Sequence, residues 1–168
     1  MFILSVMKSL ILIRHAKSDW GDHMLRDLDR PLNERGKRDA PKMAERLLER
    51  KIKIDAFISS PARRAAKTAT LFAEAFGKKK EKIRFEEKLY LAVADVFREL
   101  VSELDDVLDT VAIFSHNEGI TDYANMLCSV RVDNIPTCGI FAVRADIKSW
   151  KDFNEAEKKF WFFDYPKL

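Results

Sequence analysis

The chain has 168 residues, of which 47% are hydrophobic and 34% are charged, and this balance excludes an intrinsically disordered protein. The length is typical of a single domain with a sizeable core, and we expect one domain over residues 1–168. Thirty basic residues against 27 acidic ones give a formal charge of +3, which is too small to predict nucleic-acid binding and does not repel phosphorylated substrates.

The two cysteines, Cys128 and Cys138, form no CxxC pair and have no metal-ligand spacing with the three histidines. We therefore expect no disulfide framework, no metal and a reducing cytoplasm. The apolar residues at the start lack a basic segment before them and a cleavage site after them, so we interpret residues 1–6 as an N-terminal extension, with Met7 as an alternative start. The apolar stretch is also too short to span a membrane.

Strand and helix patterns alternate along the chain. The apolar run at residues 10–13 predicts a strand, and Asn33 is a natural N-cap for a helix whose apolar face includes Ala40, Met43 and Leu47. Pro41 falls inside that helix, so we expect a kink or a break near residues 36–41.

The rest of the chain continues this alternation. A short strand is predicted at residues 55–59, and Pro61 suits the first turn of a helix that Gly77 stops. The later apolar patterns predict strands at 83–85 and 109–114, helices at 96–108 and 120–127, and two tail strands at 139–144 and 159–165. These elements predict an α/β fold, a three-layer αβα sandwich with a mostly parallel sheet and a C-terminal hairpin at its edge.

Three of the predicted strands end in residues suited to phosphate. The first ends in Arg14-His15, the second leads into residues 59–65 with two arginines, and a later one ends in Ser115-His116-Asn117. Ligands of open α/β sheets bind beyond the carboxyl ends of parallel strands, so we expect these three loops to meet at one site.

These motifs resemble the histidine phosphatase superfamily, which is also called phosphoglycerate-mutase-like. The matching segments are 12–16 (Leu-Ile-Arg-His-Ala), 60–65 (Ser-Pro-Ala-Arg-Arg-Ala) with Thr68, and 115–117. The small size and the segment 30–36 (Arg-Pro-Leu-Asn-Glu-Arg-Gly) are most similar to its compact branch, the SixA-type phosphohistidine phosphatases.

The resemblance implies a metal-independent reaction without a cofactor. His15 would be the nucleophile that forms a transient phosphohistidine, and Arg14, Arg64 and His116 would hold the phosphoryl oxygens. Each residue type suits its task, because a neutral imidazole is a good nucleophile and a guanidinium grips phosphate with paired N–H groups. We expect Arg63 to point away from the phosphate, since neighbouring helix positions are about 100° apart.

Other residues are weaker candidates for the site. Ser18 and Asn117 are candidate phosphate ligands because they lie close to the two histidines in sequence. The glutamate that protonates the leaving oxygen in the larger family members has no counterpart, and only Asp95 offers an acid, although it could equally cap a helix.

A missing strong acid favours a phosphohistidine substrate, because imidazole leaves from a P–N bond with much less help than an alkoxide needs. We therefore predict a phosphatase for a partner protein similar to a histidine phosphotransfer domain, releasing inorganic phosphate. The alternatives are a phosphomonoesterase for a small phosphorylated substrate and a phosphate- or phosphohistidine-binding module without turnover. The aromatic tail at residues 160–163 is interpreted as edge-strand core, with a dimer patch as the alternative.

Overall fold

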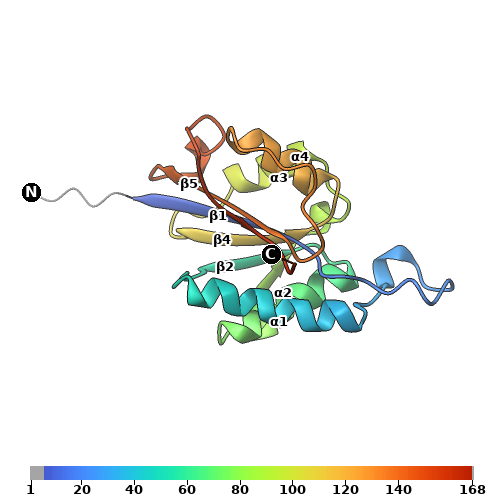
Figure 1. The fold of residues 1–168 in the computed structure, drawn as a ribbon. Coiled ribbons are helices and arrows are strands. Elements are labelled where there is room, and N and C mark those ends of the chain that lie inside the picture. The colour runs from blue at the N-terminus through green and yellow to red at the C-terminus, as the bar shows by residue number, and fades with distance from the viewer. Residues whose placement is uncertain (1–5, 168) are drawn as a thin grey trace, which may run out of the picture.

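The computed structural model describes residues 6–167, which form a six-stranded sheet in the order β3-β2-β4-β1-β5-β6 (Figure 1). The strands are β1 (Met7–Arg14), β2 (Ala56–Ser59), β3 (Ile83–Phe85), β4 (Thr110–Ser115), β5 (Ile140–Asp146) and β6 (Lys159–Asp164). The α-helices are α1 (Glu34–Glu49), α2 (Arg63–Ala75), α3 (Ala94–Ser102) and α4 (Gly119–Leu127). The short 3-10 helices are η1 (Asp27–Asp29), η2 (Lys80–Lys82), η3 (Glu87–Leu89) and η4 (Trp150–Asp152).

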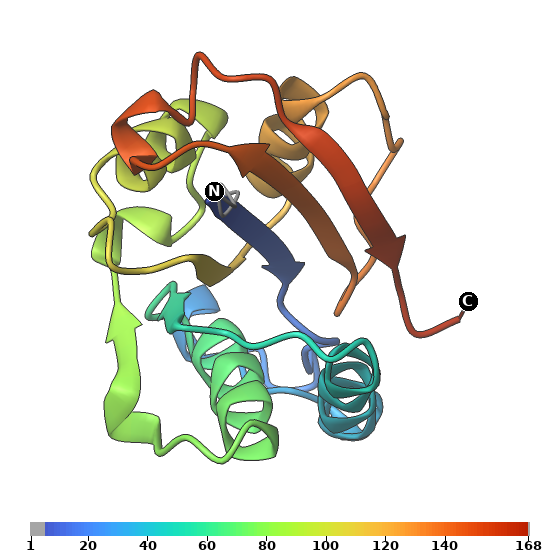
Figure 2. The same cartoon turned by 90° about the vertical axis from the view of Figure 1, so that its left-hand side faces the viewer.

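The sheet has a parallel part and an antiparallel edge. Strands β1, β4, β2 and β3 pair in parallel, whereas β5 runs antiparallel to β1 and β6 antiparallel to β5. Figure 2 shows the two tail strands side by side at one end of the sheet. The predicted α/β fold with its C-terminal edge hairpin is confirmed.

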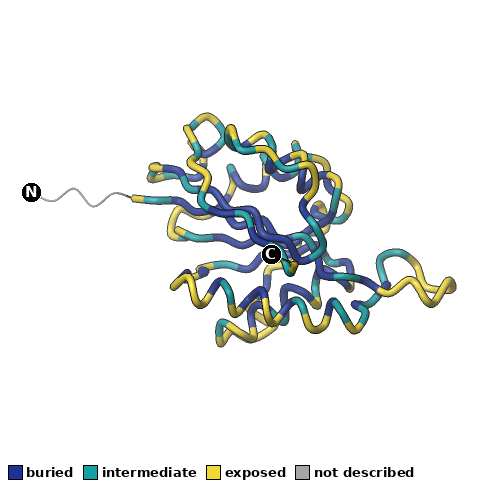
Figure 3. The backbone as a smooth tube through the Cα atoms, in the orientation of Figure 1, coloured by how far each residue is buried: buried dark blue, intermediate teal, exposed yellow. Residues whose placement is uncertain are grey.

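Helices cover both faces of the sheet, with α1 and α2 on one side and α3 and α4 on the other (Figure 1). The central strand β1 supplies both cores, because side chains alternate across a strand. Leu10 and Leu12 pack with α3 and α4, whereas Ile11 and Ile13 pack with α1 and α2. Burial on both faces explains why the sequence of this strand is one continuous apolar run. Figure 3 shows that the buried residues are concentrated in the sheet.

Helix α1 begins as predicted but continues through its proline. The Asn33 side chain accepts a hydrogen bond from the Gly36 amide at 2.9 Å, which caps the helix. The expected break near residues 36–41 is wrong, because α1 is a single element from Glu34 to Glu49. Pro41 and Lys37 are both exposed, so water can solvate the Lys37 carbonyl that loses its helical partner.

Helix α3 is shorter than predicted and ends at Ser102 instead of residue 108. The Asp105 side chain accepts a hydrogen bond from the Val107 amide at 2.9 Å, and such local bonds compete with helix formation. Leu104 and Leu108 still pack against the core, but from a turn, so the apolar spacing continued beyond the helix itself.

The tail and the start of the chain complete the comparison. In β6, Phe162 is buried, whereas Phe160 is 40% exposed, so the aromatic tail is only partly core. Strand β1 begins at Met7, and residues 1–5 of the expected extension lie outside the described residues. Within residues 6–167, no helix combines the length and the apolar character that crossing a membrane requires.

Candidate active site

The loops after β1, β2 and β4 meet at one edge of the sheet, as expected. The parallel register pairs Arg14 with Ser115 and Ser59 with Phe114, so all three strands end at the same level. A pocket of about 320 Å³ lies there. Its lining residues are Arg14, His15, Lys17, Ser18, Trp20, Asp27, Arg30, Arg64, Leu91, His116, Asn117 and Thr137.

The backbone of His15 is fixed from two neighbouring strands. Its amide donates to the Ser115 carbonyl at 3.0 Å, and its carbonyl accepts from the Cys138 amide at 3.1 Å. The Arg14 amide donates to the Gly139 carbonyl at 3.1 Å, just before β5. The residues that begin the tail hairpin therefore hold the end of β1 in place.

The side chain of His15 is held in one tautomer. Its Nδ1 lies 2.8 Å from the Ala16 carbonyl oxygen, which can only accept, so Nδ1 carries the proton of the neutral ring. The lone pair is then on Nε2. Burial lowers the pKa of His15 to about 3 against the opposing effect of the bond to Ala16, and the positive charges of Arg64 and Arg14 lower it further, so the ring is neutral at neutral pH.

His116 lies beside His15, with 5.2 Å between the ring centroids. Its Nε2 is 2.8 Å from the Ser60 hydroxyl, and its Nδ1 is buried without a hydrogen-bond partner among the described residues. Burial and then the charge of Arg64 lower the pKa of His116 to about 3. The pocket therefore holds two neutral imidazoles.

The two arginines expected at the site both line the pocket. Arg14 donates from Nη1 to the Ile135 carbonyl at 2.9 Å, and Arg64 is only 2% exposed. Arg63 is exposed and does not line the pocket, as predicted from its helix position. Thr68 links α2 to the loop after β1, because its hydroxyl accepts from the Ala16 amide at 3.0 Å and donates to the Arg64 carbonyl at 2.7 Å.

Sequence reasoning missed Asp27, which is the carboxylate of this site. Residues after β1 project from the body of the protein (Figure 1), and Asp27 in η1 returns to the pocket. Its oxygens accept from Arg64 at 3.0 Å and from Tyr90 at 2.6 Å. Burial alone would raise the pKa of Asp27, but the bonds from Tyr90 and Arg64 outweigh burial and lower it to about 2. Asp27 is therefore ionised at neutral pH.

Arg30 was also given no role in the site by sequence reasoning. Its guanidinium donates to Asp27 from Nη2 at 3.0 Å and to the Ser18 hydroxyl at 2.7 Å, and it lies 3.5 Å from the ring centre of Trp20. The available signal was the Arg-Pro pair that follows Asp27 and Asp29 between a strand and a helix cap. Tyr90 packs edge to face on His116 and also binds Asp27, so it contacts two residues of the site.

The three weaker candidates, Ser18, Asn117 and Asp95, differ in their position relative to the pocket and in their hydrogen bonds. Ser18 is buried in the pocket, and its hydroxyl proton remains free to donate because its oxygen only accepts from Arg30. Asn117 lines the pocket, but its amide already donates to Asn134 and accepts from Thr121. Asp95 is exposed in the first turn of α3 and does not line the pocket, which among the described residues has Asp27 as its one carboxylate.

Across residues 6–167, no group of three or more His, Cys, Asp or Glu side chains is arranged to hold a metal ion.

Comparison with known sequences identifies a family. Residues 10–102 match the model of the histidine phosphatase superfamily (branch 1), which includes the loops after β1 and β2. An uncharacterised chloroplastic protein of Arabidopsis thaliana is 29% identical over 157 residues, covering 88% of this chain and 71% of that protein.

Solved structures share the fold at low sequence identity. A protein assigned as the phosphohistidine phosphatase SixA of Agrobacterium tumefaciens superposes with a TM-score of 0.80 at 23% identity, covering 95% of this chain and 98% of that one. A mycobacterial glucosyl-3-phosphoglycerate phosphatase in complex with VO3 superposes with a TM-score of 0.74 at 18% identity, covering 94% and 99%.

Proposed function

This chain belongs to the histidine phosphatase superfamily, and we propose that it hydrolyses phosphohistidine on a partner protein through a covalent intermediate on His15. The family assignment makes it a phosphatase. The observation that carries the finer proposal is that Asp27, the one carboxylate that lines the pocket among the described residues, is already bound by Arg64, Arg30 and Tyr90.

In the first step, Nε2 of His15 attacks phosphorus. The new bond joins phosphorus to Nε2, and the P–N bond of the substrate breaks. Its electron pair stays on the substrate ring, whose other nitrogen already carries a proton, so neutral imidazole leaves. The Ala16 carbonyl accepts a hydrogen bond from the protonated Nδ1 of His15 at 2.8 Å and so stabilises the positive charge that develops on the phosphorylated ring. In the second step, water attacks phosphorus, phosphate is released and the electron pair returns to Nε2.

Charge on the phosphoryl oxygens needs donors that are already in place. Arg14 has uncommitted N–H groups beyond the one bound to Ile135, and the buried Nδ1 of His116 has no partner among the described residues. Arg64 donates to the carbonyl and the carboxylate of Asp27, and these two bonds fix its guanidinium beside the pocket that it lines. We assign these three side chains to the phosphoryl group, and Ser18 to a supporting hydrogen bond.

The lack of a proton donor favours a nitrogen leaving group. Asp27 has a pKa of about 2, so it holds no proton to give at neutral pH, and Asp95 is outside the pocket. An alkoxide leaving from a phosphate ester needs such a proton, whereas the imidazole of phosphohistidine is a much weaker base.

A phosphomonoesterase for a small substrate is the second candidate. It is supported by the structural similarity to the mycobacterial glucosyl-3-phosphoglycerate phosphatase. In that reaction, a water molecule would have to protonate the leaving oxygen, because Asp27 is ionised and Asp95 lies outside the pocket.

The test compares phosphate release from a phosphorylated histidine phosphotransfer domain with release from a panel of alkyl phosphates. We expect fast P–N hydrolysis, slow ester hydrolysis and loss of both in His15→Ala. His23→Ala is the matched control, because His23 is an exposed histidine in the projecting loop, and it should behave like wild type. Faster turnover of one alkyl phosphate than of the phosphoprotein would support the second candidate, and equal activity of wild type and His15→Ala would refute the proposed nucleophile.

A further inference from the structure

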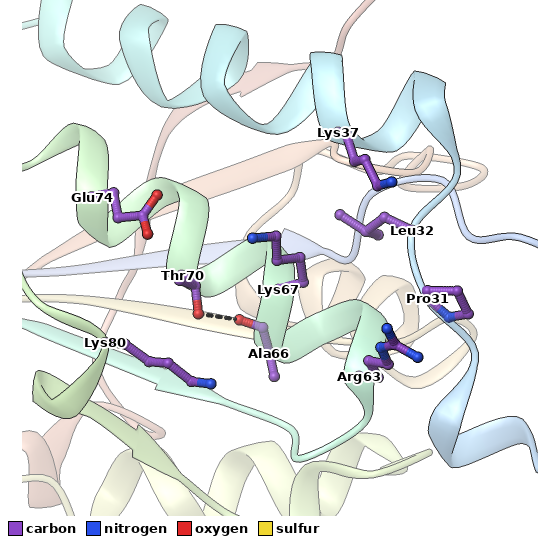
Figure 4. Close-up of a pocket in the computed structure, with 9 residues that line it drawn as sticks. All are labelled: Pro31, Leu32, Lys37, Arg63, Ala66, Lys67, Thr70, Glu74 and Lys80. Atoms are coloured by element: carbon purple, nitrogen blue, oxygen red, sulfur yellow. Dashed lines mark hydrogen bonds between the residues drawn. The ribbon is translucent and has the colours of Figure 1, made fainter.

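A second and larger hollow lies next to the active-site pocket. This basic groove has a volume of about 520 Å³ and runs along the outer side of α2, as Figure 4 shows. Its lining residues are Pro31, Leu32, Lys37, Arg63, Ala66, Lys67, Thr70, Glu74 and Lys80. None of these residues lines the active-site pocket.

The groove concentrates positive charge. Four of its lining residues are basic and one is acidic, a formal charge of +3 that equals the net charge of the whole chain. Among residues 6–167, the side chains of Arg63, Lys67 and Lys80 make no hydrogen bond or ion pair. Only Lys37 is paired, with Glu34 at 3.2 Å on the surface of α1. The charge of the groove is therefore mostly uncompensated by the protein itself.

The groove begins at the rim of the active site. Arg63 adjoins Arg64 in sequence, and Pro31 adjoins Arg30, and both Arg30 and Arg64 line the active-site pocket. From Arg63 to Glu74 the groove follows α2 for about 16 Å, at the rise of roughly 1.5 Å per residue in an α-helix. A molecule in the groove would lie next to a phosphoryl group in the pocket.

The shape of the groove and the exposure of its cations indicate whether it binds a small phosphate or an extended anionic surface. A second phosphate subsite needs donors fixed around one point, whereas these basic side chains are exposed and come from three separate elements, with Lys37 on α1, Arg63 and Lys67 on α2 and Lys80 in η2. Mobile surface cations of this kind attract an extended anionic surface and speed its association. Between the cations, Leu32, Ala66 and Pro31 add an apolar floor that suits protein contact.

We propose that this groove docks an acidic face of the phosphoprotein substrate, beside the phosphohistidine that enters the active-site pocket. The inference rests on the proposed function and names the surface that selects the partner. The ion-pairing residues on the partner are Asp and Glu side chains, which meet Arg63, Lys67 and Lys80 while the phosphoryl group reaches Arg14 and Arg64.

The test reverses charge in the groove and leaves the catalytic pocket intact. The variant is Lys67→Glu with Lys80→Glu, and the control is Lys148→Glu with Lys159→Glu, which makes the same change of charge at exposed lysines on the β5–β6 side. The probes are an acidic phosphotransfer domain phosphorylated on histidine, a version of it with the acidic residues of that face changed to amides, and free phosphohistidine.

For the groove variant, we expect kcat/KM on the acidic phosphoprotein to fall on the order of tenfold, through KM with kcat unchanged. Activity on free phosphohistidine and on the amide version should match wild type, as should the control variant on every probe. The wild-type rate on the acidic phosphoprotein should fall with added salt, and the groove variant should lose most of that dependence.

Three results would contradict the docking proposal. If wild type and the groove variant hydrolyse the acidic phosphoprotein equally, the groove does not dock it, although the proposed function stands. If the groove variant loses activity on free phosphohistidine as much as on the acidic phosphoprotein, the groove binds a small anion and not an acidic protein face. If wild type hydrolyses no phosphohistidine at all, the proposed function itself fails, and the assigned partner fails with it.

Discussion

Gly36 in the first turn of α1 packs directly against the loop that follows the nucleophile. A Cβ atom at this position would lie 2.2 Å from the Lys17 carbonyl oxygen and 3.0 Å from the Lys17 amide nitrogen. Contacts between such atoms need about 3.4 Å, so the change Gly36→Ala forces roughly 1 Å of movement between α1 and the Lys17 backbone. Neither side is a flexible side-chain end, and Lys17 lines the active-site pocket.

The expected change in the free energy of unfolding follows from two opposing effects, overpacking and helix propensity. Overpacking costs about 1–3 kcal/mol, and alanine regains about 1 kcal/mol of helix propensity over glycine, so we expect the free energy of unfolding to fall by at most about 2 kcal/mol. Activity should fall further, because a displacement of about 1 Å at a reacting group can cost on the order of 100-fold in rate.

Urea unfolding and kcat/KM measured on the same preparations test this prediction. Gly21→Ala is the control, because its added Cβ would meet the end of the Asp19 side chain, which can rotate away, and both quantities should stay near wild type. A Gly36→Ala enzyme with wild-type kcat/KM would refute the claim that α1 positions the loop after His15.

Three further predictions concern Lys8, Tyr90 and the two histidines of the pocket. Replacing Lys8 with Met removes bonds of 2.6 and 2.9 Å to two carbonyls and one of 2.9 Å to a carboxylate. The free energy of unfolding, measured in urea, should fall by about 2–3 kcal/mol while activity is retained. An unchanged unfolding midpoint would contradict this prediction. Tyr90→Phe removes the 2.6 Å bond to Asp27. Steady-state kinetics should show a several-fold drop in kcat, while the free energy of unfolding stays within about 1 kcal/mol of wild type. A wild-type kcat would show that this bond does not position the site. Because His15 and His116 have pKa values of about 3 in the fold and an ordinary value near 6.5 when unfolded, the unfolded chain binds more protons between these values. The free energy of unfolding should therefore fall as the pH is lowered from about 6.5 toward 3, and urea titrations should show a shallower fall when both histidines are replaced by Asn.

The sequence predicts those parts of the fold and site that depend on local pattern. The run from Leu10 to Ile13 is apolar at every position because β1 is buried on both faces, and Asn33 is recognisable as a cap from its own chemistry. The meeting of the three loops at one site could be predicted from the sequence, because the carboxyl ends of parallel strands lie at the same edge of a sheet.

Contacts between distant polar residues leave no such pattern. Asp27 lies in an irregular loop, and its partners Arg64 and Tyr90 are far away in sequence, so nothing local distinguishes it from its neighbour Asp29. Lys8 reads as a solvent-exposed strand residue, yet it is 1% exposed because carbonyls near the start of β4 surround its ammonium group.

The bonds that hold His15 also have a consequence for how the protein is made. The His15 carbonyl is held by the Cys138 amide, and β5 pairs along most of β1, so the support of the first motif comes from the last quarter of the chain. On a ribosome, the nucleophile emerges early, but its final position must wait until the residues around Cys138 have left the exit tunnel. A translation product that stops before β5 can carry the Arg14-His15 pair and the arginines of α2, but it lacks the strand that fixes them, so phosphatase activity should appear only after β5 has emerged.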